Sequence, residues 1–263
     1  FTVGSDSAGN SGTMVAWNWK AGTSFSNSAG ANGADIASSG SVNTDAGFSI
    51  ITATSNSGSD VKIAHGLGAV PDAIFAKNLD TGYSWDVYFK TLGYNASLQL
   101  NDTAAVRTGA WGSTTFTSTF FQAKNNYSSK NGSPYIYYCF AQKQGYSKFG
   151  SYIGNGSDTP NGVFVYLGFT PAYILIKATD SNSWVIVNNK SPDNSNAVDN
   201  SLAADSAAPE TTGDSNTTFD FLSNGFKTNG NSGNNNSSGQ KYVFMAFAES
   251  PFVTSTGIPA TAR

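Results

Sequence analysis

A repeat of about 100 residues limits what this chain of 263 residues can fold into more than any other feature. The run GAVPDAIFAKNLD at 68–80 returns as GFTPAYILIKATD at 168–180, which is 100 residues later. Trp85 returns as Trp184 in the same way. Because tandem sequence copies fold as copies of one structural unit, we expect two similar modules.

Each copy is typical of short strands joined by turns. Runs rich in Val, Ile, Thr, Tyr and Phe end at Gly, Asn, Asp or Pro, as strands do. In the first copy these runs are 48–54, 72–78, 84–90, 113–121 and 134–142, and the second copy contains a similar series. The sequence therefore predicts an all-β fold of tandem antiparallel β-sandwiches, jelly-roll-like, with about 100 residues in each repeat.

The repeat also predicts module boundaries. Residues 47–142 and 143–252 are expected to form one sandwich each. Residues 1–22 match only the end of a unit, because Trp19 falls at the position of Phe140. We interpret this segment as the terminal strand remnant of a preceding repeat.

Two segments fall outside the repeat. Residues 23–46 consist mainly of Gly, Ser, Ala and Asn, a composition that predicts a flexible linker. Residues 253–263 are expected to be a C-terminal tail. Since the chain begins with Phe1, the sequence is expected to be a processed or truncated piece.

Composition argues against several classes of protein. The net charge of -3 and the absence of Lys/Arg runs argue against a nucleic-acid partner. No apolar run reaches the roughly 20 residues that cross a bilayer, so membrane insertion is not expected. With one His and one Cys, zinc sites of the usual composition are excluded, and no G-x-S-x-G elbow stands in a strand-turn-helix setting. We expect no enzymatic activity, no cofactor and no metal site.

The remaining reactive residue types have structural interpretations. Cys139 lies in the apolar run YIYYCFA and is expected to fill core space. His65 is expected to end a strand and make a structural hydrogen bond, with ligand contact as the alternative. Asp80 and Asp180 match between the copies, and an Asp at such a position usually caps a turn, with Ca²⁺ binding or catalysis as alternatives.

Aromatic residues offer the candidate binding site. Trp85 and Trp184 occupy equivalent strand positions and are expected in a core or on a sheet face. Trp111 lies in a Gly/Ser/Thr-rich loop, and sugar-binding surfaces use exposed rings beside amide and hydroxyl groups. Trp111, with Tyr94 and Tyr127, is therefore the predicted glycan- or receptor-binding patch. The alternative is that these loop aromatics pack onto their own sandwich.

Several runs together resemble a known group of proteins. These runs include GFSIITATSNSG, HGLGAVPDAIFAKN, YSKFGSYIGNG and FDFLSNGFKTNG, with YVFMAFAESPFVTSTGIPATAR at the end of the chain. The set resembles the C-terminal repeat region of tail-fibre-like virion structural proteins of marine bacteriophages, particularly those of cyanobacteria. The resemblance covers nearly all of the chain from Gly47 onward, and it brings no catalytic residue with it.

The resemblance implies a non-enzymatic virion protein, extracellular and located in a tail or fibre, that contributes to host attachment. The expected partners are other copies of the chain, other virion proteins and a host cell-surface glycan. Two alternatives stay open. One is a glycan-binding or glycan-cleaving domain of a bacterial surface or tailspike protein, and the other is a purely structural filament subunit.

Overall fold

The structure, a computed structural model, describes residues 16–191 and 196–251. Every pair of neighbouring strands in its sheets is antiparallel, and the helical segments in these ranges are two short 3-10 turns. The predicted all-β, antiparallel sandwich fold is therefore confirmed.

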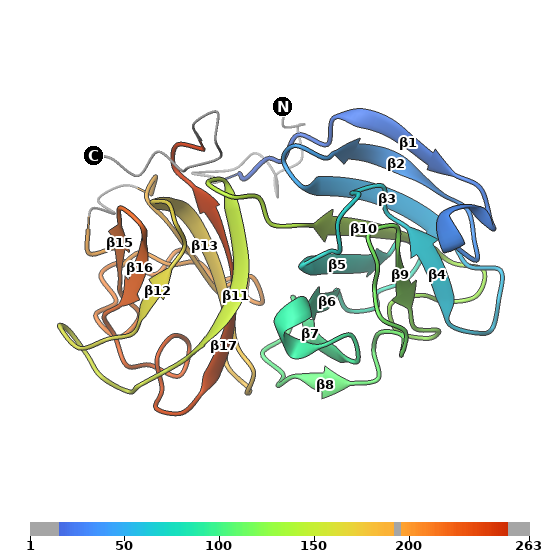
Figure 1. The fold of residues 1–263 in the computed structure, drawn as a ribbon. Coiled ribbons are helices and arrows are strands. Elements are labelled where there is room, and N and C mark those ends of the chain that lie inside the picture. The colour runs from blue at the N-terminus through green and yellow to red at the C-terminus, as the bar shows by residue number, and fades with distance from the viewer. Residues whose placement is uncertain (1–15, 192–195, 252–263) are drawn as a thin grey trace, which may run out of the picture.

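Figure 1 shows two halves side by side, joined by the chain between β10 and β11. The elements of the first half are β1 (Thr23–Asn27), η1 (Ala31–Gly33), β2 (Ser38–Asn43), β3 (Phe48–Thr54), β4 (Val61–Ala64), β5 (Ala73–Asn78), β6 (Asp86–Phe89), η2 (Lys90–Leu92), β7 (Ala96–Gln99), β8 (Arg107–Thr108), β9 (Phe120–Ala123) and β10 (Pro134–Phe140). Those of the second half are β11 (Ser147–Ile153), β12 (Phe164–Tyr166), β13 (Pro171–Ala178), β14 (Val185–Asn188), β15 (Phe219–Leu222), β16 (Gly225–Thr228) and β17 (Lys241–Ala248).

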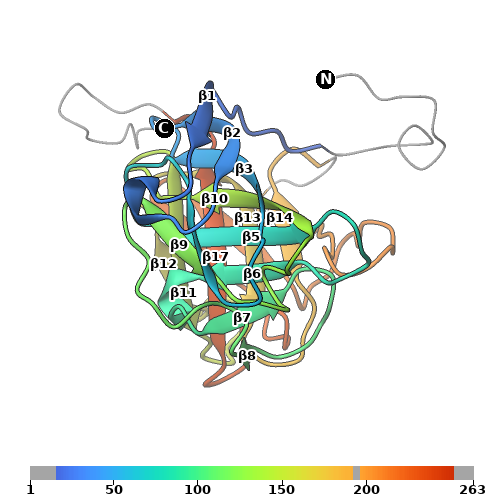
Figure 2. The same cartoon turned by 90° about the vertical axis from the view of Figure 1, so that its right-hand side faces the viewer.

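Each half combines a main sheet with a smaller one. The first main sheet has the order β1-β2-β3-β10-β5-β6-β7-β8, which Figure 2 shows from top to bottom, and the small sheet is β4-β9. The second main sheet has the order β11-β17-β13-β14, and its small sheet is β12-β16-β15. Apolar side chains fill the space between the two sheets of each half, with Ile63 and Trp111 in the first and Ile174 and Phe226 in the second.

Strands that match in sequence occupy matching places. The order β3-β10-β5-β6 in the first half corresponds to β11-β17-β13-β14 in the second. The register also corresponds, since Phe140 pairs with Ala73 and Phe247 pairs with Tyr173. Ala73 and Tyr173 are 100 residues apart, as the sequence repeat requires.

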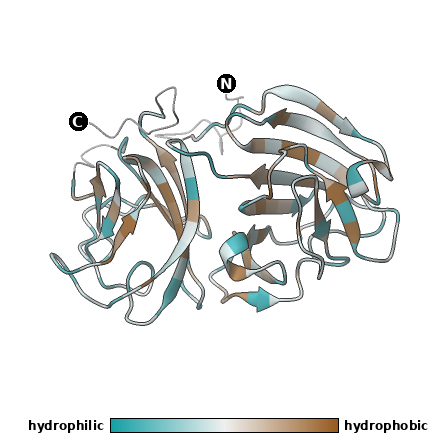
Figure 3. Cartoon of the chain, viewed as in Figure 1, coloured by the Kyte–Doolittle hydropathy of each residue, from teal (hydrophilic) through white to brown (hydrophobic). Residues whose placement is uncertain are grey.

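The two main sheets pack face to face through one shared core. This shared core contains buried residues of both halves, among them Phe75, Phe140, Leu175 and Met245. Figure 3 shows that hydrophobic residues gather on the strands while the loops are largely hydrophilic. Strands β6 and β14 and most of β17 are buried on both faces, because side chains on one face pack into the core of their own half and those on the other face pack into the shared core. The repeats are therefore joined by a common core rather than only linked in series.

Aromatic rings form the part of the shared core nearest the connection between the halves. The ring centroids of Phe140 and Phe247 lie 6.1 Å apart. Trp19 lies 5.8 Å from Phe140 and 5.4 Å from Phe247. The three residues that the repeat aligns with one another thus meet at one point.

Polar contacts also connect the halves. The indole Nε1 of Trp184 donates a hydrogen bond to the carbonyl oxygen of Gln99 at 2.7 Å. The backbone N–H of Val106 donates to the carbonyl of Thr179 at 2.8 Å. Because directional bonds add to the non-directional apolar contact, they fix one orientation of the two main sheets.

The linker prediction for residues 23–46 is wrong. This segment forms β1, η1 and β2. Strands β1 and β2 are the two outermost strands on one side of the main sheet, and β2 pairs with β1 and with β3. Gly40 comes so close to β3 that an added Cβ would lie 2.0 Å from the carbonyl oxygen of Ile50. Edge strands gain their stability chiefly from backbone hydrogen bonds, so small polar residues that resemble a linker can build them.

The prediction for residues 1–22 is tested only in part. Residues 16–22 form no strand, although Trp17 and Trp19 pack against the shared core. Residues 1–15 and the predicted tail at 253–263 lie outside the described residues.

We expect the two halves to unfold together, because they share a core. Replacing Phe140 with Ala should lower the free energy of unfolding by about 3–5 kcal/mol, the usual loss for a buried Phe. Urea unfolding followed by far-UV circular dichroism and by tryptophan fluorescence should give one coincident transition in both proteins. Tyr94→Ala, at an exposed position, is the control and should leave the midpoint nearly unchanged. Two separate transitions in the wild type would contradict a common core.

Candidate functional site

The structure places Trp111 in the core, which contradicts its predicted role at the surface. The side chain is 0% exposed and packs against Tyr88, Phe116 and Phe121 between the main sheet and β4-β9. Trp111 forms an isolated antiparallel bridge with Ala123 of β9, and its large ring fills the interior. The alternative weighed for these aromatics, packing onto their own sandwich, is correct for this residue.

Tyr94 and Tyr127 do lie at the surface, with 40% and 42% of their area exposed. The guanidinium carbon of Arg107 lies 5.3 Å from the ring centroid of Tyr127, within the range of a cation–π contact. The predicted patch is therefore not a cluster of three rings. Of the three predicted residues, Tyr94 and Tyr127 are exposed, and the ring of Tyr127 contacts the Arg107 guanidinium.

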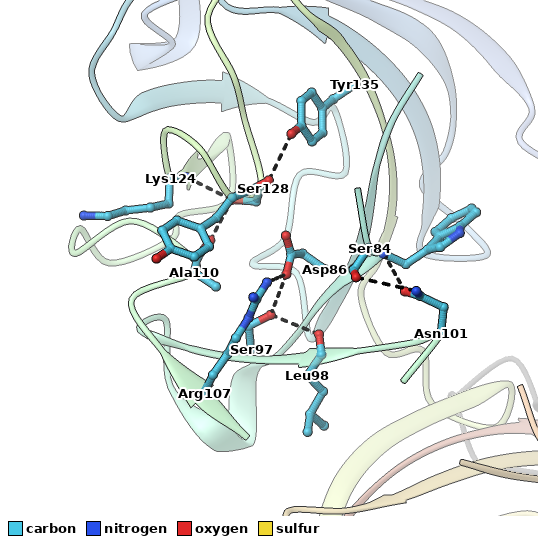
Figure 4. Close-up of polar contacts among 12 residues, drawn as sticks. Ser84, Asp86, Ser97, Leu98, Asn101, Arg107, Ala110, Lys124, Ser128 and Tyr135 are labelled. Carbon is cyan, nitrogen blue, oxygen red and sulfur yellow. Dashed lines mark hydrogen bonds and ion pairs between the residues drawn. The ribbon is translucent and has the colours of Figure 1, made fainter. Parts of the chain in front are cut away.

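Arg107 belongs to a polar network in the first half, shown in Figure 4. Its guanidinium forms an ion pair with Asp86 at the start of β6, and the hydroxyl of Ser97 donates a hydrogen bond to the same carboxylate oxygen at 3.3 Å. The Asp86 side chain is 5% exposed. Burial raises the pKa of this carboxyl, and the charge of Arg107 and the two hydrogen bonds oppose that shift only in part. The network ties β6, β7 and β8 together and holds Arg107 beside Tyr127.

His65 is of the type that acts as a general base and Cys139 of the type that acts as a nucleophile, and both side chains are fully buried. His65 follows β4, its Nε2 lies 3.2 Å from the carbonyl oxygen of Thr117, and its Nδ1 accepts a hydrogen bond from the N–H of Leu67. Burial raises the pKa of the Cys139 thiol well above its usual value, which disfavours the thiolate. The structural interpretations of both residues are confirmed.

Lys177 carries an unusual buried charge near the contact between the halves. Its ammonium donates hydrogen bonds to the carbonyl oxygens of Ala178 at 2.9 Å, Asp180 at 2.8 Å and Thr103 at 3.3 Å, the last from the other half. Burial lowers the pKa of Lys177 to about 8, and nearby aspartates oppose the shift. Three carbonyl acceptors use all three protons of the ammonium, so this lysine acts as a structural clamp.

The carboxylates considered as candidate site residues form no common site. Asn78, rather than Asp80, caps the turn after β5, since its side-chain oxygen accepts hydrogen bonds from the N–H groups of Asp80 and Thr81. Glu249 pairs with Lys190 at 3.3 Å. Within 16–191 and 196–251, no three His, Cys, Asp or Glu side chains gather closely enough to hold a metal ion.

A cavity of about 470 Å³ lies beside the shared core. Its lining is mostly apolar and comes from both halves and from the segment before β1. The principal aromatic residues are Trp17, Trp19, Trp85, Tyr138 and Tyr173. Trp85 and Trp184 both face the shared core, as their equivalent positions predicted.

Of the comparisons with known proteins, only the one with protein families found a match. The profile described as a domain of unknown function, DUF7483, matches residues 1–251, and the chain belongs to that family. No curated protein and no solved structure matched the chain. None of the helices in the described part of the chain has the length and apolar character needed to span a bilayer.

The buried and exposed candidate residues should respond differently to truncation. Trp111→Ala should cost about 3–5 kcal/mol of unfolding free energy, because it empties a core position. Tyr127→Ala should cost less than about 1 kcal/mol, the size of an exposed cation–π contact. Chemical unfolding followed by circular dichroism compares the two. Equal losses would contradict the placement of Trp111 in the core.

His65 should make the protein sensitive to acid. Burial lowers the pKa of His65 from its usual 6.5 to about 4, so the unfolded chain takes up a proton before the folded one. The stability that this residue contributes is complete above about pH 6.5 and is lost as the pH falls towards 4, on the order of 3 kcal/mol in all. Unfolding at a series of pH values should show that His65→Gln loses less stability across this interval than the wild type. Parallel losses in both proteins would refute the assignment.

Proposed function

We propose that the chain is a non-enzymatic structural protein of a bacteriophage virion, located in a tail or fibre, that contributes to attachment to the host surface. The proposal starts from the resemblance of its repeat region to tail-fibre-like proteins of marine phages. Its partners are other copies of the chain, other virion proteins and a glycan of the host surface.

The observation that carries this proposal is the shared core between the two main sheets. A core that unites two sandwiches makes them one stiff body, which suits an extracellular part that must transmit force or hold binding loops at a distance. Such a body can present several weak contacts, and several copies in one particle raise the effective concentration of each next contact.

The state of the reactive side chains also favours a non-enzymatic role. His65 and Cys139 are enclosed in the first half, and Lys177 is held by three carbonyl groups. Groups that act as acids, bases or nucleophiles must reach the substrate. The exposed features are instead tyrosine rings with neighbouring cations, which suit binding.

Retention of the full chain on immobilised host-cell polysaccharide tests the proposal. We expect the polysaccharide to retain the protein and no new reducing ends to appear. Release of reducing ends would overturn the proposal in favour of a glycan-cleaving domain, because glycoside hydrolysis creates one reducing end for each bond cut. If the polysaccharide neither retains the protein nor is cleaved by it, the result favours a purely structural filament. Labelling intact virions with an antibody against the chain tests the location, and unlabelled virions would overturn it.

A further inference from the structure

A second, polar cleft lies where the first half passes into the second. It has a volume of about 380 Å³ and lies between the connection from β10 to β11 and the end of β12. Its lining residues are Gln142, Gln144, Gly145, Ser147, Lys148, Tyr166, Leu167 and Gly168. None of them belongs to the predicted patch.

Tyr166 supplies an aromatic surface in this cleft. Its side chain is 59% exposed, the largest exposed fraction among the big apolar and aromatic residues of the described chain. Gly168 adopts a positive φ of 85° beside it, and a Cβ there would lie 3.4 Å from the Tyr166 hydroxyl. Because Gly168 has no side chain, the backbone can turn close to the Tyr166 hydroxyl while the ring remains exposed to solvent.

Lys148 supplies a cation without a carboxylate partner. Its ammonium donates a hydrogen bond to the carbonyl oxygen of Tyr166 at 2.9 Å and lies 5.1 Å from the centroid of the Tyr166 ring. The described residues provide no carboxylate within ion-pair distance of it. Since an ammonium has three donors, two remain for a ligand.

Gln142 and Gln144 supply amide groups on the same cleft. Both residues are exposed. Their side chains make no hydrogen bond to another residue in 16–191 or 196–251. Each amide can therefore donate and accept hydrogen bonds with a ligand, as the paired hydroxyl groups of a sugar require.

We infer that this cleft binds a saccharide residue that carries a carboxylate, such as a hexuronate. The apolar face of the sugar ring packs on Tyr166, the carboxylate pairs with Lys148, and the hydroxyl groups bond to the two amides. The biological role of this site rests on the proposed function, because host attachment would supply the acidic polysaccharide.

Titration of the full chain with methyl galacturonide, and separately with methyl galactoside, tests the inference. The two probes differ only at the carboxylate, and binding can be followed by nuclear magnetic resonance or calorimetry. We expect weak binding of the acidic sugar, with Kd on the order of 1 mM, and at least about tenfold weaker binding of the neutral one. Equal binding of both sugars, or binding of neither, would overturn the inference.

Variants locate the binding to this cleft. Tyr166→Ala should weaken binding of the acidic sugar by roughly tenfold. Lys148→Met keeps the apolar stem and should abolish the preference for the acid. Leu79→Ala removes an exposed apolar side chain outside the cleft and should bind like the wild type. Wild-type affinity in Tyr166→Ala would overturn the assignment. If that variant is still retained on host polysaccharide, the proposed function stands while this site is rejected.

Discussion

The arrangement of the two halves depends on one apolar layer between the main sheets. Both sheets contribute side chains to this layer, among them Phe75, Phe140, Leu175 and Met245. Removing a side chain of this size from water contributes about 1.5–3 kcal/mol, so a layer of such residues outweighs any single polar contact between the halves. The layer also explains why antiparallel strands such as β6 and β14 are apolar on both faces rather than on one. Hydrogen bonds such as that from Trp184 to Gln99 then select one orientation of the sheets.

In 16–191 and 196–251, the charged side chains that are buried have partners that compensate them. Asp86 has Arg107 and Ser97, and Lys177 has three carbonyl oxygens. An uncompensated charge in such a place would cost several kcal/mol. Burial raises the pKa of Asp86 and lowers the pKa of Lys177. The Lys177 clamp reaches across the contact to Thr103, so the same bonds that satisfy a charge also join the halves.

Most of the aromatic residues are buried, so few aromatic rings are exposed where they could contact a ligand. Trp111, Trp184 and the core phenylalanines are enclosed, while Tyr127 and Tyr166 stay accessible. Each of these two rings has a cation at about 5 Å, Arg107 in the first half and Lys148 in the second. A chain with little net charge can in this way place positive charge locally, and screening leaves short-range contacts more important than long-range steering.

The sequence by itself determined the all-β class, the correspondence of strands between the copies, the core position of Cys139 and the structural hydrogen bond of His65 at a strand end. These features depend on local strand and turn preferences and on a pattern that repeats along the chain. Only the tertiary structure decided that the main sheets share a core, that residues 23–46 form edge strands and that Trp111 is enclosed. The largely apolar sequences of β13 and β17 indicated that both faces of these strands are buried, but such a pattern does not identify what covers the second face. Edge pairing depends on the backbone of a neighbouring strand, and the exposure of a ring depends on how a loop closes, so neither is encoded in composition or spacing.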